Sequence, residues 1–271
     1  MFQTIIRAGE VIEDFTIIDC RFRLNDPEFG KNEYLKDHII GAYYAHLDND
    51  LSDPVVPGIT GRHPLPSLEK LDNLFSSYGI EKGKQVVVYD DMGGAIAARL
   101  WWLLKWVGHL EVAVLDGGYQ AWKKANRKIS SEIPKYIEGI VFKSKPDFSM
   151  LIEAQQFEKG FSDQIGLVDC RTEERYLGVH EPIDPVAGHI PGAINIPHNS
   201  QLDEEGKWKS AEEVRLNFKN TSFLEFAFYC GSGVTACFNI LAMEYAGLGR
   251  GKLYAGSWSH WITDSRRPVA N

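Results

Sequence analysis

Short runs of β-branched and other apolar residues alternate along the chain with longer segments whose apolar positions recur every three or four residues. The short runs predict buried strands, and the longer segments predict helices. Strands are expected at 15–19, 85–89, 112–115, 165–169 and 224–229, and helices at 68–78, 95–107, 118–124, 211–218 and 234–246. Alternation of strand and helix predicts an α/β fold, in which helices cover both faces of a mostly parallel sheet.

Several landmarks of the first half return in the second half in the same order. The matching pairs are 17–21 with 167–171, 38–42 with 189–193, Gly117 with Gly256, and Trp122 with Trp261. Ordered self-similarity of this kind indicates a duplicated domain. We expect a first domain over 1–129, a linker over 130–147 and a second domain over 148–271.

Composition and charge narrow the functional classes. The 271 residues are 44% apolar and 24% charged, as in an ordinary globular protein of two domains. The net charge of −8 opposes a nucleic-acid binder, because affinity for phosphate backbones comes from clustered Lys and Arg. Four cysteines without C-x-x-C spacing predict neither a metal site nor a disulfide framework. We expect no cofactor.

The sequence predicts neither a membrane span nor an export signal. The most apolar stretch, 95–107, falls short of the roughly 20 residues that a membrane helix needs, and it contains Arg99 and Lys105. The first residues show no basic segment followed by an apolar run. We therefore expect a cytoplasmic protein whose thiols stay reduced.

One loop carries candidate chemistry. After the strand that ends at Tyr229, the chain reads Cys230-Gly231-Ser232-Gly233-Val234-Thr235-Ala236 and then enters a helix. Glycines at these places let backbone N–H groups turn inward as an anion-binding nest, and the helix N-terminus adds positive potential. Such a place favours thiolate over thiol, which predicts a nucleophilic Cys230. The other cysteines are expected to be small buried hydrophobes, although a redox pair of Cys230 with Cys237 stays open.

This loop, the two Asp-x-Arg strand ends and both His-Ile-x-Gly-Ala segments resemble the rhodanese superfamily, specifically its two-domain sulfurtransferases. The resemblance covers nearly the whole chain and implies two tandem rhodanese-like domains. It also implies an enzyme whose Cys230 takes a sulfur atom from a small donor and holds it as a persulfide. The sulfur then passes to a thiol or to cyanide, and a thioredoxin-like reductant is a further implied partner.

The resemblance also implies roles for particular residues. Arg175 would bind the anionic donor, together with the loop positions Gly231, Gly233, Val234 and Thr235. Ser232 would join His38 and Asp26 of the first domain in a proton relay.

The first domain is expected to be catalytically silent. Asp90 stands where Cys230 stands in the second domain, and an aspartate cannot accept sulfur. The segment 91–98 lacks the Gly-x-Gly-Val-Thr order, so we expect no glycine-lined nest there.

The donor and the reaction leave alternatives. Cys-Gly-Ser-Gly-Val-Thr-Ala is typical of 3-mercaptopyruvate sulfurtransferases, whereas thiosulfate-type enzymes usually have Arg and Lys at the positions of Gly231 and Ser232. Asp184 stands nine residues after Arg175, where mercaptopyruvate enzymes often have a second arginine. Asp184 is thus a departure from the mercaptopyruvate pattern, but the loop sequence makes mercaptopyruvate the favoured donor. The alternatives are a thiosulfate:cyanide sulfurtransferase and a persulfide carrier in a sulfur relay.

Two readings from other classes are weaker. A phosphatase on this fold needs an arginine six residues after the cysteine, and Ala236 stands there. A non-enzymatic binding module would have no need of the intact Cys230 loop.

Overall fold

A computed structural model describes residues 1–157, 165–219 and 223–271, and the chain forms two compact units. Unit 1 comprises Met1–Asp53, Leu65–Asp147 and Glu204–Trp208. Unit 2 comprises Pro54–Pro64, Phe148–Asp203 and Lys209–Asn271. Segment 54–64 lies in the first half of the chain but belongs to unit 2, and segment 204–208 lies in the second half but belongs to unit 1. These two exchanged segments were not anticipated from the sequence.

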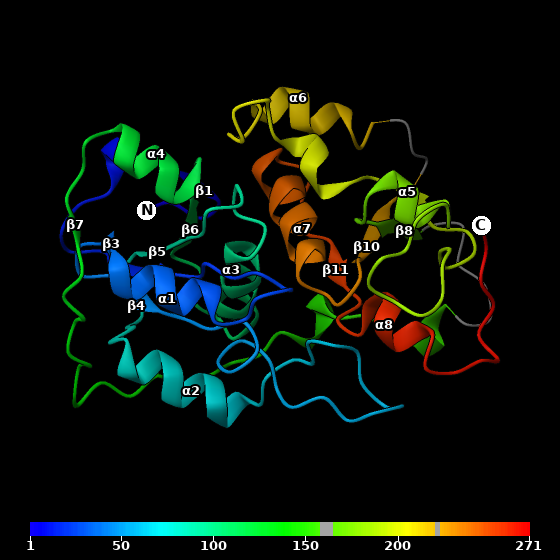
Figure 1. The fold of residues 1–271 in the computed structure, drawn as a ribbon, viewed down its shortest axis with the longest axis horizontal. Helices are drawn as coiled ribbons and strands as arrows, with labels where there is room; N and C mark the ends of the chain where they lie inside the picture. The colour runs from blue at the N-terminus through cyan, green and yellow to red at the C-terminus, as the bar shows by residue number, and fades with distance from the viewer. Residues whose placement is uncertain (158–164, 220–222) are drawn as a thin grey trace. The chain divides into compact units, whose positions relative to one another are not determined.

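Unit 1 contains a five-stranded parallel sheet in the order β1-β6-β5-β2-β4. Its strands are β1 (Ile5–Ile6), β2 (Thr16–Asp19), β4 (Tyr43–Tyr44), β5 (Val86–Tyr89) and β6 (Val112–Leu115). Its helices are α1 (Phe29–Lys36), α2 (Leu68–Ser77), α3 (Ala97–Trp106) and α4 (Gly118–Lys124), and a 3-10 turn covers Ala8–Glu10 (Figure 1). Every residue of α3 is buried and the helix packs on β5 and β6. The apolar stretch of the sequence is thus a core helix.

The expected linker belongs to unit 1. Its first residues form β7 (Ile129–Ser130), which pairs antiparallel with β3 (His38–Ile39). Further along, Phe142 N donates to Ser76 Oγ and Lys145 N donates to the carbonyl oxygen of Val107. Residues 130–147 are therefore held against unit 1 by hydrogen bonds and do not form a free connection.

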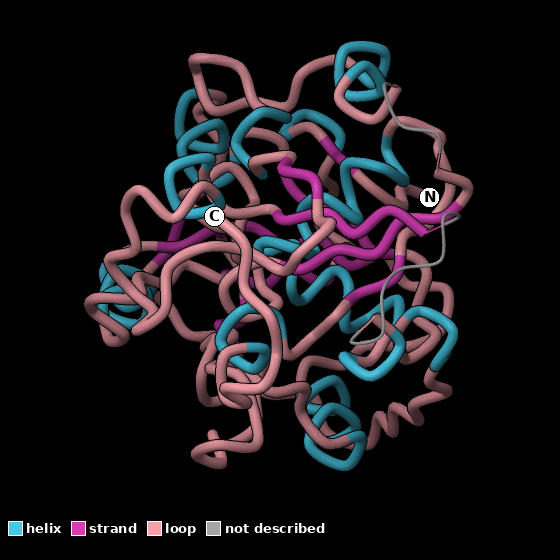
Figure 2. Tube along the Cα trace, turned by 90° about the vertical axis from the view of Figure 1, so that its right-hand side faces the viewer, coloured by secondary structure: helices cyan, strands magenta, loops and turns pink. Residues whose placement is uncertain are grey.

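Unit 2 contains a parallel sheet in the order β11-β10-β8-β9. Its strands are β8 (Ile165–Asp169), β9 (Ile194–Asn195), β10 (Glu225–Tyr229) and β11 (Lys252–Leu253). Its helices are α5 (Glu173–Tyr176), α6 (Ala211–Leu216), α7 (Thr235–Tyr245) and α8 (Ser257–Trp261), with 3-10 turns at Phe148–Met150, Ala154–Gln156 and His198–Gln201. Figure 2 shows the strands in magenta, with helices and loops outside them.

The repeated sequence landmarks form the same buried frame in both units. The Asp19 carboxylate binds the Arg21 guanidinium in unit 1, and Asp169 binds Arg171 in unit 2, with an N–O distance of 2.7 Å in each pair. The tyrosine that ends the central strand accepts a backbone N–H through its hydroxyl in both, from Ile39 and from Ile190. These repeated polar residues thus have a structural role in each unit.

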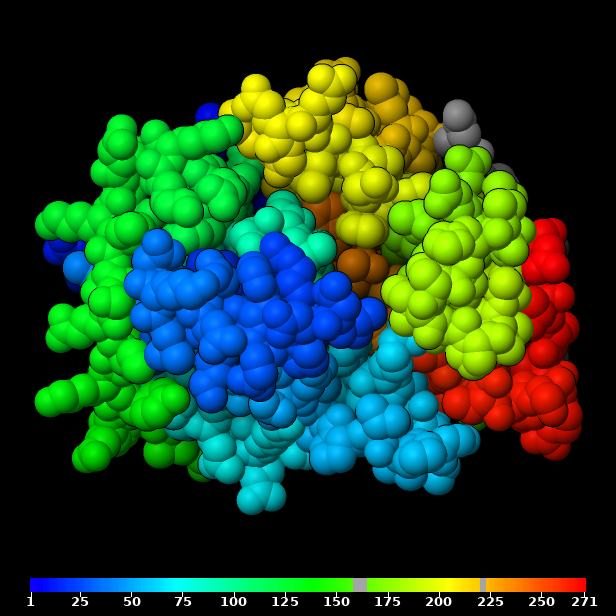
Figure 3. All heavy atoms as spheres, in the orientation of Figure 1, coloured from blue at the N-terminus to red at the C-terminus, as the bar shows by residue number. Residues whose placement is uncertain are grey.

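The C-terminal residues pack back onto unit 2. His189 and Ala270 exchange backbone hydrogen bonds of 2.7 and 3.0 Å. In Figure 3 the yellow-green surface around residues 175–190 lies beside the red surface of the last residues. Among the described helices, none is long and apolar enough to cross a membrane.

Candidate active site

Cys230 lies where β10 ends and the chain turns into α7. Its side chain is almost fully buried, at 2% exposure, and its Sγ accepts the backbone N–H of Gly233 at 3.2 Å. Gly233 has φ +79°, and a Cβ there would lie 2.4 Å from the carbonyl oxygen of Ala255. Only glycine meets both conditions, so the loop needs this residue to turn an N–H toward the sulfur. The first N–H groups of α7 have no intrahelical acceptor and add positive potential there.

The start of α8 holds the backbone of the loop in place. Ser257 Oγ accepts the N–H of Cys230 at 3.1 Å, and Trp258 N donates to the carbonyl oxygen of Cys230 at 3.0 Å. Ser259 N donates to the carbonyl oxygen of Gly231 at 2.9 Å. Both polar backbone groups of Cys230 are thereby used, which holds its backbone in one orientation.

The histidine that contacts Ser232 is His63, which the sequence did not suggest. Its Nδ1 lies 2.7 Å from Ser232 Oγ, and both side chains are buried in unit 2. His63 belongs to the exchanged segment Pro54–Pro64. A serine hydroxyl and an imidazole at this distance can pass a proton between them.

His38, which we expected in the relay, has its described hydrogen-bond contacts within unit 1. Both ring nitrogens of His38 face backbone carbonyl oxygens of its own unit, Nδ1 that of Tyr34 at 2.7 Å and Nε2 that of Glu132 at 3.1 Å. His189, its counterpart in unit 2, bonds in the same way to Tyr176. The histidine of the repeated segment thus makes the same kind of contact in both units. Asp26 is exposed in unit 1, and a relay of Ser232 with His38 and Asp26 stays a prediction.

Two guanidinium groups lie against the loop. A Cβ on Gly231 would come within 2.8 Å of Arg62 Nη2 and 3.4 Å of Arg175 Nη2. Arg175 therefore lies beside Gly231 of the loop, and a second cation there is Arg62 from the segment Pro54–Pro64. A pocket of about 420 Å³ in unit 2, lined in part by Arg62, Asp184 and Ser259, opens beside these groups.

Carboxylates hold the arginines in place. Arg62 Nη1 forms an ion pair with Asp184 Oδ1, and Arg175 Nη2 reaches Asp184 Oδ2 at 2.9 Å. Arg175 Nε also donates to both oxygens of Glu181, which accepts the N–H of Asp184 as well. Burial raises the pKa of Glu181, but the bonds from Arg175 and the backbone outweigh it, so the net pKa lies below its usual range. Both carboxylates thus act as anions that orient guanidinium groups.

In the equivalent loop of unit 1, backbone N–H groups point inward as an anion-binding nest, and the Asp90 carboxylate occupies it. Asp90 Oδ1 accepts the N–H groups of Met92 and Gly94 at 2.8 Å, and Oδ2 accepts those of Ile96 and Ala97 at 2.7 and 2.9 Å. The expectation that this segment makes no glycine-lined nest is therefore wrong. Gly93 and Gly94, both with positive φ, supply it in an order the sequence comparison did not recognise.

The remaining cysteines and pockets offer less chemistry. Burial raises the pKa of the Cys20 and Cys170 thiols well above its ordinary value, and Cys237 Sγ donates to the carbonyl oxygen of Gly233.

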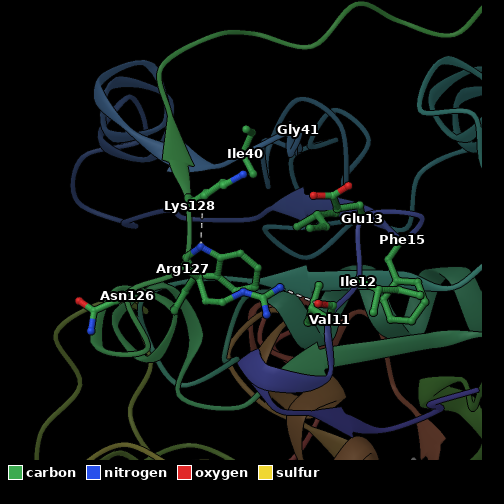
Figure 4. Close-up of a pocket in the computed structure, with 11 residues that line it drawn as sticks. Val11, Ile12, Glu13, Phe15, Ile40, Gly41, Asn126, Arg127 and Lys128 are labelled. Carbon is green, nitrogen blue, oxygen red and sulfur yellow. Dashed lines mark hydrogen bonds between the residues drawn. The ribbon is translucent and has the colours of Figure 1, made fainter.

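A pocket of about 560 Å³ in unit 1 is bordered by Arg127 and Lys128 (Figure 4). Arg127 is tied to the carbonyl oxygen of Val11, and none of the residues that line the pocket is a cysteine, serine or histidine. Within the described residues, no group of three or more His, Cys, Asp or Glu could hold a metal ion.

Comparison with known proteins agrees with this architecture. A model of the rhodanese-like domain matches residues 2–125 and 153–264. A Pseudomonas aeruginosa protein named "Probable 3-mercaptopyruvate sulfurtransferase" is 44% identical, over 95% of this chain and 92% of that protein. The thiosulfate sulfurtransferase of Bos taurus is 34% identical, over 95% of this chain and 88% of that protein.

Solved structures that superpose on this chain include two enzymes of the same kind. The 3-mercaptopyruvate sulfurtransferase of Leishmania major superposes with a TM-score of 0.86 at 32% identity, covering 98% of this chain and 76% of that chain. A "3-mercaptopyruvate sulfotransferase" of Escherichia coli superposes with a TM-score of 0.81 at 26% identity, covering 95% of this chain and 100% of that chain.

Proposed function

The chain belongs to the rhodanese family and is a sulfurtransferase, and on this premise we propose that it transfers sulfur from 3-mercaptopyruvate through a persulfide on Cys230. The observation that carries the proposal is the Cys230 sulfur under the Gly233 N–H, beside Ser232–His63 and two arginines. A persulfide is an anion that gains from the same N–H groups.

Sulfur loading proceeds by attack of the Cys230 thiolate on the sulfur of the donor. A bond forms between the two sulfurs, the donor carbon–sulfur bond breaks, and its electron pair goes to carbon as the enolate of pyruvate. The proton of the donor thiol moves to that carbon, which leaves pyruvate and a Cys230 persulfide anion. Ser232 Oγ and His63 Nδ1, 2.7 Å apart, supply a path for this proton.

The charges around the loop favour mercaptopyruvate over thiosulfate. The donor carboxylate needs one two-pronged cation, which Arg175 or Arg62 can supply. Thiosulfate is a dianion and gains from cations inside the loop, where this chain has Gly231 and Ser232. Loss of one charge-assisted contact costs roughly 1.5–3 kcal/mol, or about one to two powers of ten in kcat/KM.

The acceptor completes the cycle. A thiolate or cyanide attacks the outer sulfur, takes it, and releases the Cys230 thiolate, so no cofactor is consumed. A thiol acceptor fits a protein of the reducing cytoplasm, where thiols are abundant. A thioredoxin-like protein would supply such a thiol. A persulfide carrier in a sulfur relay would use the same loop, and only the acceptor distinguishes it.

Steady-state kinetics with both donors test the proposal. We expect a higher kcat/KM for mercaptopyruvate, with thiosulfate used poorly but measurably. Intact mass after donor treatment should show one added sulfur on the wild type and on Cys237→Ser, but none on Cys230→Ser. Arg175→Ala should lower kcat/KM for mercaptopyruvate, because it removes a cation that would bind the donor carboxylate. The nucleophile itself is unchanged in this variant. Equal or better use of thiosulfate would leave the thiosulfate:cyanide enzyme as the function.

A further inference from the structure

Asp184 contacts both arginines that lie against the catalytic loop. Its two carboxylate oxygens are divided between them, Oδ1 to Arg62 and Oδ2 to Arg175. Its side chain is only 2% exposed, whereas those of Arg62 and Arg175 are 27% and 14% exposed. The carboxylate therefore lies deeper than the guanidinium groups that a donor would meet.

The surrounding charges balance without any bound anion. Arg171 pairs with Asp169, and Glu181 lies between Arg171 and Arg175, 3.2 and 2.9 Å from their guanidinium nitrogens. Three guanidinium groups thus face three carboxylates, counting Asp184. An incoming anion finds arginines whose charge is already compensated, and each added negative charge is also repelled by Asp184.

We propose that Asp184 is a specificity-determining residue, which favours donors with a single negative charge and weakens the binding of dianions. The inference rests on the proposed function, since it concerns the donor of that same site. A monoanion can accept the free N–H groups of one guanidinium while Asp184 keeps its own bonds. A dianion needs both guanidinium groups at once, for which it competes directly with the buried carboxylate. Arg62 and Asp184 both line the pocket of about 420 Å³, so an anion in this pocket would meet the ion pair between them.

Anion binding to inactive protein tests this without turnover. In the Cys230→Ser background, calorimetry would measure Kd for sulfate, a dianion shaped like thiosulfate, and for pyruvate, a monoanion. Asp184→Asn keeps the size and one acceptor oxygen but removes the charge. We expect sulfate to bind about tenfold to a hundredfold more tightly in this variant, and pyruvate less than threefold more tightly. In active protein, the ratio of kcat/KM for thiosulfate to that for mercaptopyruvate should rise by a similar factor.

Two controls separate charge from position. Asp184→Glu keeps the charge and should keep the weak sulfate binding of the parent. Glu225→Gln removes the same charge at the far end of β10, where Glu225 pairs with Lys252 at the surface, and should change neither Kd. Thermal melting checks that each variant is folded.

The outcomes are distinct. Weaker binding of both anions to Asp184→Asn would mean that Asp184 merely positions the arginines and would overturn the proposal. So would unchanged binding, or an equal gain for both anions. If the wild type transferred sulfur from neither donor, the proposed function would fail, while the two dissociation constants would still report on Asp184.

Discussion

Replacing Asp90 by asparagine should destabilise unit 1 strongly. The carboxylate is fully buried and accepts four backbone N–H groups at 2.7–2.9 Å, which are those of Met92, Gly94, Ile96 and Ala97. All four partners are donors, so the side chain acts only as an acceptor. Burial raises the pKa of this carboxyl, and the four N–H groups oppose that shift. The side chain takes the place that a bound anion would occupy at the start of α3.

The magnitude follows from the number of bonds lost. Asparagine offers one acceptor oxygen, and its amide group turns two N–H donors toward two of the four backbone N–H groups. Each buried donor left without an acceptor costs roughly 1–3 kcal/mol, so the free energy of unfolding should fall by about 2–6 kcal/mol. Asp91→Asn is the matched control, because Asp91 pairs at 2.7 Å with Arg23, whose side chain is 30% exposed. The Asp91 side chain is 12% exposed, so this two-pronged pair is only partly buried and its loss should cost about 1 kcal/mol.

Urea unfolding and hydrogen exchange measure the two effects. The unfolding midpoint of Asp90→Asn should fall by about 1 M or more. Because a two-unit chain need not unfold in one step, exchange of the α3 amides, followed by mass spectrometry, identifies the unit that opens. Equal losses for Asp90→Asn and Asp91→Asn would show that the nest does not stabilise the start of α3, and the reasoning would fail.

Three further predictions follow from the site and the core. His63→Gln should lower kcat for mercaptopyruvate about a hundredfold or more, because Ser232 loses its proton partner. The control His38→Gln should leave the kcat of folded protein near wild type. Similar losses in both variants would contradict the assignment of His63 to the relay. Asp90→Cys should gain no stable sulfur at residue 90 by peptide mapping, because this fully buried nest is closed to donors. Burial lowers the pKa of His198, so the unfolded chain binds a proton first as pH falls below about 6.5. Stability should therefore decline below that pH, and His198→Gln should flatten the decline in pH-dependent melting.

The strand and helix pattern determined most of the fold. Expected strands such as 165–169 and 112–115 were found at the same residues, because a buried parallel strand must be apolar throughout. The helix expected at 95–107 begins two residues later, at Ala97, and ends one residue earlier, at Trp106. The loop after Cys230 could be expected to turn an N–H toward the sulfur, because the glycines that this requires are next to Cys230 in sequence.

The partners of that loop could not be found in this way. Arg62 and His63 come from a Pro- and Gly-rich segment that reads as an ordinary loop, and the fold carries it into unit 2. His38 had the stronger sequence signal, since it repeats as His189. A residue that repeats in both halves can be there because both halves have the same fold, and both histidines make the same backbone contact. Asp184 stood in the sequence as a missing arginine, and its contacts with two guanidinium groups exist only after folding. Sequence alone shows groups that act with their neighbours in the chain, while groups that meet across 100 residues or more, such as His63 and Ser232, are brought together by packing.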